Sequence, residues 1–320
     1  MSNAPQRADA VVCGAGVAGI GAAYFLSLHD DFKRIVIIDE RPPLTLTSDK
    51  STECYRNWWP GPGPEMVTFM DRSIDLLEEF SDRTNNRIGL NRRGYLFASA
   101  DPNNREAFVD ESLARSALGI GETRVHSNSA HRYPPAHMTN VDKSLRGADV
   151  FTNAALIQEQ FPYLPADTQA VIHARRCGWL SAQQLGMLML EEAKERGVEV
   201  VMASLKGIET QTGAVSAVRL ESAQGEHEIT TSTVINAAGP MFRAVGAMAN
   251  VDIPVTCEGH VKIAFADTKN AMARETPLLI WVDPVELGWT ADQRNDLAAD
   301  PELKYLTQQF PAGVHGRPEG

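Results

Sequence analysis

Three glycines near the amino terminus have the spacing of a dinucleotide-binding turn. Gly14, Gly16 and Gly19 form a GxGxxG pattern. In such a turn the first glycine lets the chain leave a strand sharply, the second lets backbone N–H groups approach a pyrophosphate, and the third lets the helix pack closely on the strand. Because ordinary glycine-rich turns also produce this spacing by chance, the neighbouring elements decide what it means.

Two acidic residues follow at the distance that a ribose-binding acid requires. Asp39 lies 25 positions (39 − 14) after the first glycine, and the fingerprint places its acid about 20 residues on. Asp39 continues the inward positions Ile35 and Ile37, so it is the better candidate to bind ribose hydroxyls, and Glu40 is the second. A carboxylate here repels a 2′-phosphate, which disfavours NADP and leaves FAD and NAD open.

The residues around the glycines predict a strand–helix–strand unit that would position them. Segments 8–13 and 35–38 are apolar runs typical of strands that are covered on both faces of a parallel sheet. Segment 20–28 between them is predicted to be a helix, and 198–203 and 233–236 are predicted to be further strands. The sequence therefore predicts an α/β fold with a Rossmann-like domain built on a parallel sheet.

The rest of the chain is predicted to alternate regular elements with irregular segments. Helices are predicted at 65–83, 103–118 and 181–196. Strands are predicted at 94–98, 215–220, 227–230 and 261–265. Segments 45–64, 121–149 and 311–320 have no periodicity and are expected to be irregular.

Composition excludes several classes of protein. The 320 residues carry a net charge of −11, which opposes binding to nucleic acid or to an anionic membrane surface. The four cysteines form no CxxC pair, so we expect neither a zinc site nor a disulfide framework, and a cytoplasmic location is the simplest. We find no secretory signal and no apolar run long enough to span a membrane.

His126, His131 and His137 match no metal-ligand spacing, so we interpret them as surface histidines and predict no metal.

Several segments, in their order and separation, resemble the D-amino-acid oxidase family of flavoproteins, which includes glycine oxidase and sarcosine oxidase. The resemblance runs from residue 9 to about 285 and is carried by segments 9–39, 48–56, 91–97, 178–180 and 234–240. It implies FAD as cofactor and two discontinuous domains. The FAD-binding domain would comprise 1–88 and 165–246, and an α+β substrate domain with a mixed or antiparallel sheet would comprise 89–164 and 247–320. Family members continue beyond this point with a further glycine-rich turn and helix. We therefore expect either a chain that is truncated at its carboxyl terminus or a reduced relative of the family, with an incomplete substrate domain in both cases.

The resemblance also implies which residues contact the cofactor. The glycines would face the pyrophosphate, Asp39 or Glu40 the adenosine ribose, Ser51 and Thr52 the flavin side, and Val200 or Val201 the adenine. The full predicted set is Gly14, Ala15, Gly16, Val17, Ala18, Gly19, Asp39, Glu40, Arg41, Ser51, Thr52, Val200, Val201, Ala237, Ala238 and Gly239.

The reaction that the resemblance implies is oxidation of a C–N bond in an amine or amino acid, with hydride transfer to flavin N5 and with oxygen or an electron carrier as acceptor. Arg56 is the first candidate for a cation that binds a substrate carboxylate, although a surface arginine is the alternative. Lys262 is a second candidate. Trp58 and Trp59 would cover the substrate entrance or pack beneath an irregular segment. An NAD(P)H-linked hydroxylase and a non-catalytic flavin-binding or assembly protein remain alternative functions.

Overall fold

The structure is a computed structural model that describes residues 5–130, 133–137 and 142–319. The chain divides into two compact units. Unit 1 contains the residues through Glu53, Arg83–Gly89 and Leu180–Ala264, and unit 2 contains Cys54–Asp82, Leu90–Trp179 and the residues from Phe265 onward. This division differs from the predicted domain boundaries because 54–82 and 165–179 fall in unit 2, and Gly89 and 247–264 fall in unit 1. The assignment of cofactor and substrate roles to the domains stays a prediction.

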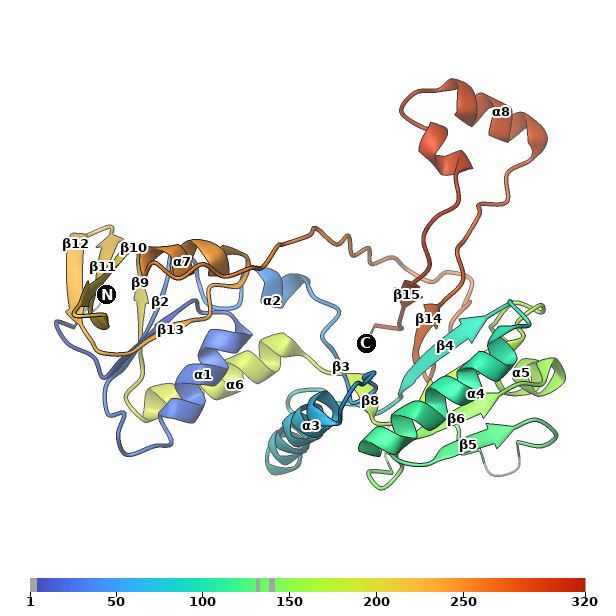
Figure 1. The fold of residues 1–320 in the computed structure, drawn as a ribbon, viewed down its shortest axis with the longest axis horizontal. Coiled ribbons are helices and arrows are strands. Elements are labelled where there is room, and N and C mark those ends of the chain that lie inside the picture. The colour runs from blue at the N-terminus through green and yellow to red at the C-terminus, as the bar shows by residue number, and fades with distance from the viewer. Residues whose placement is uncertain (1–4, 131–132, 138–141, 320) are drawn as a thin grey trace. The chain divides into compact units, whose positions relative to one another are not determined.

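Unit 1 is built on a four-stranded sheet in which all neighbours are parallel. Its strands have the order β13 (Val234–Asn236), β1 (Ala10–Cys13), β2 (Ile35–Asp39) and β9 (Glu199–Met202). Helices α1 (Val17–Leu26) and α6 (Ala182–Glu195) pack against each other (Figure 1). Ser181 caps α6, because its side chain accepts a hydrogen bond from the Gln184 N–H. The predicted α/β fold with a parallel sheet is confirmed.

An antiparallel sheet and a short helix complete unit 1. Strands β10 (Ser204–Gln211), β11 (Ala214–Ser222) and β12 (Gly225–Thr230) form this sheet, and α7 (Phe242–Met248) follows β13 and the single turn η2 (Gly239–Met241). Ile208, Val218 and Leu220 are buried in one cluster with Val11 and Val36 of the parallel sheet. The antiparallel sheet therefore covers the face of β1 and β2 that carries Val11 and Val36.

Unit 2 is built on a mixed six-stranded sheet, as predicted for the substrate domain. Its order is β15 (Val314–Gly316), β14 (Leu278–Trp281), β4 (Tyr95–Ser99), β7 (Ala170–Ala174), β6 (Ala148–Phe151) and β5 (Thr123–His126). Helix α4 (Asn104–Arg115), which continues into η1 (Ser116–Ile120), packs on one face through Phe108. Helix α5 (Ala154–Gln160) packs on the other face through Ile157.

The remaining elements of unit 2 lie outside this sheet. Strand β3 (Cys54–Arg56) pairs with β8 (Cys177–Trp179), and helix α3 (Glu65–Arg83) begins and ends where the sequence predicts. Helix α8 (Ala291–Ala299) and the turn η3 (Lys304–Thr307) lie between β14 and β15.

Four sequence-based predictions were wrong. The supposedly irregular segments contain short elements: α2 (Thr47–Lys50) and β3 in 45–64, β5 and the start of β6 in 121–149, and β15 in 311–320. Each has only three or four residues, too few for a periodic pattern to stand out. The fourth error is 261–265, which is not a strand: the alternating Val261, Ile263 and Phe265 are 88%, 76% and 84% exposed.

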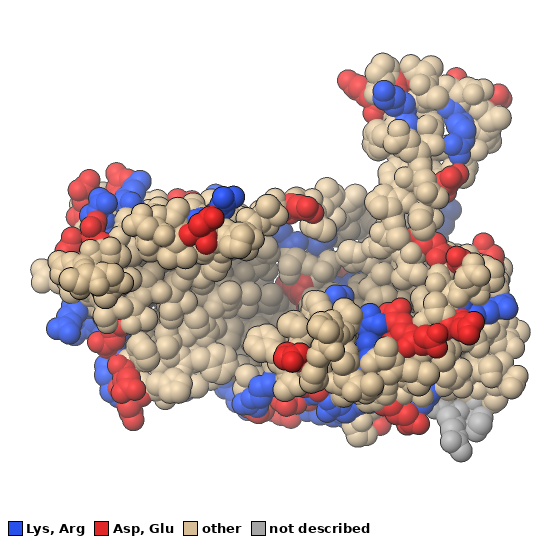
Figure 2. All heavy atoms as spheres, in the orientation of Figure 1, with Lys and Arg blue, Asp and Glu red and all other residues tan. Residues whose placement is uncertain are grey.

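Figure 2 shows acidic and basic side chains interspersed on the visible face of the molecule.

Within the described part of the chain, no helix combines the length and apolar character needed to cross a membrane.

Candidate functional site

The glycine-rich turn of unit 1 is packed too closely for side chains at two positions. Gly14 has a φ of +112°, and a Cβ placed on it would lie 2.3 Å from the Ala237 carbonyl oxygen. A Cβ on Gly19 would lie 1.9 Å from the carbonyl oxygen of Gly14. Real Cβ atoms essentially never come closer than 3.0 Å to such atoms. The first and third glycines thus let β1, α1 and the turn after β13 meet.

The amino terminus of α1 presents backbone N–H groups beside this turn. Val17 is the first residue of the helix, Gly16 precedes it, and the first turn contains no acidic residue. The Ser48 hydroxyl accepts a hydrogen bond from the Val17 N–H at 3.0 Å, and a Cβ on Gly16 would lie 3.2 Å from the same hydroxyl oxygen. Ser48 thus contacts the end of α1, although it is not in the predicted cofactor set and only begins the 48–56 segment that resembles the flavin-side loop.

The two acids after β2 have different partners. Asp39 accepts hydrogen bonds from the N–H groups of Ala15 (2.8 Å) and Arg41 (2.9 Å), so it holds the glycine-rich turn against the end of its own strand. Glu40 is exposed, and one of its oxygens accepts from the Ser204 hydroxyl at 3.3 Å. Which of the two binds ribose stays a prediction, but only Asp39 contacts the turn.

The other predicted cofactor residues in β9 and in the turn after β13 lie at or near the carboxyl ends of the parallel strands. Val200 and Val201 of β9 are paired in register with Ile37 and Ile38 of β2. The Ala237 N–H donates to the Cys13 carbonyl oxygen at 2.9 Å, which fixes the turn 237–239 beside the end of β1. Ligands of open α/β sheets bind at the carboxyl ends of such strands.

Ser51 and Thr52, which were predicted to face the flavin, follow α2 within unit 1, and both are partly buried. Lys262, the second candidate cation, donates to the Ser51 carbonyl oxygen at 3.0 Å. It therefore contacts the predicted flavin-side loop from a segment that is not a strand.

These residues fit a dinucleotide with a pyrophosphate and a ribose. The helix end supplies N–H groups and a positive dipole for the diphosphate, as helix amino termini commonly do. Close packing at Gly14 and Gly19 makes glycine the only residue that fits there without a shift of the backbone. The acids Asp39 and Glu40 lie at the end of the adjacent strand.

Arg56 lies in unit 2 and is not a surface arginine. It is partly buried, and its guanidinium carbon lies 4.5 Å from the centre of the Trp59 ring and 5.9 Å from that of Tyr95. Its side chain forms no hydrogen bond or ion pair with any described residue, and its Nε is a buried donor without an acceptor. Cys177 pairs with it in the sheet register, but burial raises the pKa of that thiol to about 12, so it stays protonated.

Trp58 and Trp59 differ in their surroundings. Trp58 is 3% exposed within the core cluster on one face of the six-stranded sheet, whereas Trp59 is partly buried at its edge. Packing is therefore the role of Trp58, and Trp59 supports the Arg56 guanidinium.

One histidine interpretation was wrong. His126 is buried, and its Nε2 lies 2.9 Å from a carboxylate oxygen of Asp149. Parallel pairing of β5 with β6 brings the two residues together across 23 positions of sequence. Burial raises the pKa of the Asp149 carboxyl, but Arg124, Arg175 and His126 together hold it below its usual value. His137 is exposed, and His131 lies outside the described residues.

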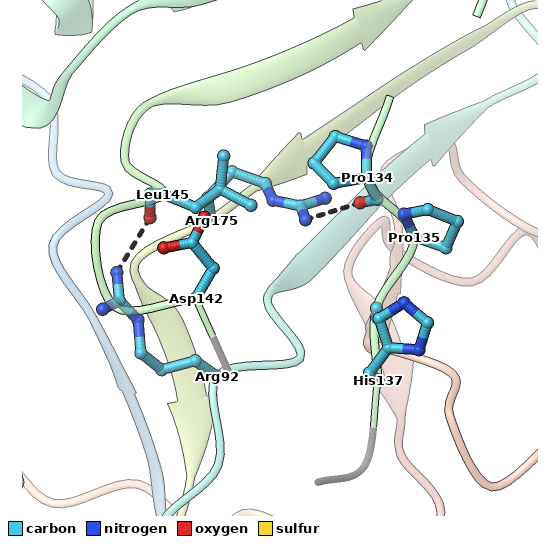
Figure 3. Close-up of a pocket in the computed structure, with 8 residues that line it drawn as sticks. Arg92, Pro134, Pro135, His137, Asp142, Leu145 and Arg175 are labelled. Atoms are coloured by element: carbon cyan, nitrogen blue, oxygen red, sulfur yellow. Dashed lines mark hydrogen bonds between the residues drawn. The ribbon is translucent and has the colours of Figure 1, made fainter. Parts of the chain in front are cut away.

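A separate pocket of about 230 Å³ lies in unit 2 (Figure 3). Its lining residues are Arg92, Pro134, Pro135, Ala136, His137, Asp142, Leu145 and Arg175. Arg175 donates to the Pro134 carbonyl oxygen at 2.7 Å and Arg92 to that of Leu145 at 2.8 Å. Both guanidinium groups thus hold loop backbone in place.

The fold and the glycine-rich turn together define a dinucleotide-binding protein with a second unit built on a mixed sheet. The sequence matches the DAO family of FAD-dependent oxidoreductases over residues 9–291, so the chain belongs to this family. FAD is the cofactor of the family, as predicted. No curated protein matches the sequence significantly.

Solved structures share the fold at low sequence identity. L-proline dehydrogenase from P. horikoshii has a TM-score of 0.64 at 17% identity, covering 95% of this chain and 76% of that one. L-amino acid deaminase from Proteus myxofaciens has a TM-score of 0.60 at 18% identity, covering 79% and 50%. Glycine oxidase from Bacillus cereus ATCC 14579 has a TM-score of 0.57 at 15% identity, covering 75% and 58%. The chain thus spans between half and three quarters of the length of these proteins.

Proposed function

We propose that this protein is an FAD-dependent oxidoreductase that oxidises a C–N bond of an amino acid. When bound, FAD would supply the two-electron acceptor, at flavin N5, for a hydride from the carbon beside the substrate nitrogen. The imine product then hydrolyses in water. Oxygen or an electron carrier as final acceptor and a cytoplasmic location belong to the same proposal. The names of the similar structures, which include proline dehydrogenase, glycine oxidase and amino acid deaminase, support this class of substrate.

The predicted cofactor residues of unit 1 would hold the dinucleotide. The N–H groups at the start of α1 would bind the pyrophosphate, and the acids after β2 would bind the ribose. Ser48 accepts from the Val17 N–H at this helix end, which adds it to the proposed cofactor residues.

The substrate assignment rests on one observation, the lack of an acidic partner for Arg56 among the described residues. Burying part of a cation costs folding free energy unless an anion neutralises its charge. Trp59 and Tyr95 lie against the guanidinium, and its terminal nitrogens, which are not fully buried, are available for a two-point interaction with a carboxylate. We therefore propose that Arg56 binds the carboxylate of the substrate.

Reduction of the bound flavin tests this proposal. The protein would be reconstituted with FAD and mixed anaerobically with amino acids and with amines that lack a carboxylate, and the flavin absorbance would be followed. We expect amino acids to bleach the flavin. We expect Arg56→Gln to raise the substrate concentration at half-maximal rate about 10- to 100-fold, the value of a charge-assisted pair. Arg72→Gln, which removes an exposed charge from α3 of the same unit, is the matched control.

Three results would contradict the proposal. A protein that retains no flavin after reconstitution cannot perform this reaction. Reduction by NAD(P)H in place of an amino acid would favour the hydroxylase alternative. Retained flavin that no amine or amino acid bleaches would favour a non-catalytic flavin-binding protein.

A further inference from the structure

A second guanidinium group lies in the same aromatic cluster as Arg56. Arg115 is the last residue of α4, and its guanidinium carbon lies 5.0 Å from the centre of the Trp58 ring. Arg56 lies over Trp59, the next residue of the chain. Pairing of β3 with β8 and packing of α4 on the sheet thus bring together two cations that are separated by 59 positions of sequence.

The terminal nitrogens of both guanidinium groups have hydrogen-bonding capacity that the described residues leave unused. For Arg56, neither Nη1 nor Nη2 has a hydrogen-bond partner there, and only its Nε is fully covered. Arg115 uses Nη1 for Glu111, and its Nη2 has no partner among the described residues and is not fully covered. Accessible guanidinium nitrogens from two arginines form the donor set that a carboxylate binds best.

Glu111 sets the charge of this cluster. One of its carboxylate oxygens lies 2.8 Å from Nη1 of Arg115, one helical turn away on α4. Burial lowers the pKa of Arg115, Glu111 raises it and the charge of Arg56 lowers it, so the three charges act on one another. Two guanidinium groups and one carboxylate leave a single net positive charge, which one carboxylate of a ligand neutralises. A ligand with two carboxylates would bring an uncompensated negative charge beside Glu111.

We propose that Arg115 is a second substrate-binding cation beside Arg56, and that Glu111 limits the site to substrates that carry a single carboxylate. The inference rests on the proposed function and narrows its substrate class to amino acids with one acidic group. Arg56 holds the carboxylate, Arg115 adds a further donor, and Glu111 opposes a second acid.

Tryptophan fluorescence of the full chain tests this inference without flavin chemistry, because Trp58 and Trp59 lie against the two guanidinium groups. Acetate and succinate would be titrated at constant ionic strength as probes with one and two carboxylates. We expect saturable changes in emission and an acetate Kd at least as low as that of succinate. We expect Arg115→Gln to raise the acetate Kd about tenfold, as loss of one charge-assisted hydrogen bond predicts. Arg105→Gln, an exposed arginine at the other end of α4, should leave the Kd within about twofold of the unsubstituted value.

Glu111→Gln keeps the inference testable even if Arg115→Gln folds poorly. This variant leaves both cations in place and removes the opposing acid, so we expect the succinate Kd to fall about tenfold and the acetate Kd to change much less. A succinate Kd that does not respond to Glu111→Gln, or an acetate Kd that does not respond to Arg115→Gln, overturns the inference.

The two proposals fail in different ways. If acetate binds as expected but no amino acid reduces the flavin, the oxidoreductase proposal fails and the anion site stands. If amino acids reduce the flavin equally well in Arg115→Gln, the role of Arg115 fails and the oxidoreductase proposal stands.

Discussion

Two glycines of helix α1 should respond to alanine in opposite directions, although they are two residues apart. At Gly19, the added Cβ would lie 1.9 Å from the carbonyl oxygen of Gly14, which is backbone and cannot rotate away. At Gly21, the nearest atom is the methyl carbon of Met189 at 3.8 Å, an ordinary contact. Both positions lie within the helix, so the gain in helix propensity on replacing glycine is similar for the two.

The structure gives the size of each effect. Gly19→Ala requires β1 and α1 to separate by about 1 Å, and overpacking of this kind costs about 1–3 kcal/mol of unfolding free energy. Gly21→Ala creates no clash and should raise the unfolding free energy by about 0.5–1 kcal/mol.

Urea denaturation followed by circular dichroism measures both variants against the unsubstituted protein. Gly19→Ala should unfold at a lower urea concentration and Gly21→Ala at a higher one. Equal stability of the two variants, or a Gly19→Ala protein as stable as the parent, would show that the first strand and helix are not packed as described here.

Three further substitutions test other parts of the structure. Asp39→Ala removes the acceptor of two backbone N–H groups, so it should lower the unfolding free energy by about 1–3 kcal/mol and weaken FAD binding, whereas Glu40→Gln should leave stability unchanged in the same urea titration. Ser181→Ala removes the cap of α6 and should lower the thermal midpoint through a loss of about 1 kcal/mol; an unchanged midpoint would contradict the capping role. His173 is fully buried, and burial followed by the charge of Arg175 holds its pKa well below 6.5. Its neutral form therefore stabilises the fold above about pH 6.5, and this contribution decreases as the pH falls through that value. His173→Gln should flatten the loss of unfolding free energy between about pH 7 and pH 5, and a variant with the slope of the parent protein would refute this.

Apolar patterning and glycine spacing were enough to predict the framework of unit 1. Strands β1 and β2 are nearly continuous apolar runs because both of their faces are covered. Helix α3 was predicted to the residue since its apolar positions recur every three or four residues. Strand β10 was not predicted, because its sequence mixes polar and apolar residues and its register with β11 shifts at two points. Its position depends on a partner strand, which local sequence does not reveal.

The candidate site likewise contains residues that local sequence could identify and residues whose surroundings it could not reveal. The glycines and Asp39 were identified because their spacing along the chain reflects one local unit, and the structure places Asp39 on the turn itself. Arg56 was selected by its place after the flavin-side loop, but the sequence could not distinguish it from a surface arginine. That distinction depends on Trp59, Tyr95 and the lack of an ion pair between Arg56 and any described acid.

Arg115 shows most clearly what the sequence alone could not provide. On helix α4 it has a glutamate four positions earlier, a pattern that indicates an ordinary solvent-exposed ion pair. Only the folded chain brings its guanidinium onto Trp58 and near a second cation. A charged residue therefore becomes a candidate for binding when the charges around it do not balance, and that balance is a property of the tertiary structure. Arg56, Arg115 and Glu111 together carry one net positive charge. We therefore expect the substrate to carry one negatively charged group, a carboxylate, where it contacts this cluster.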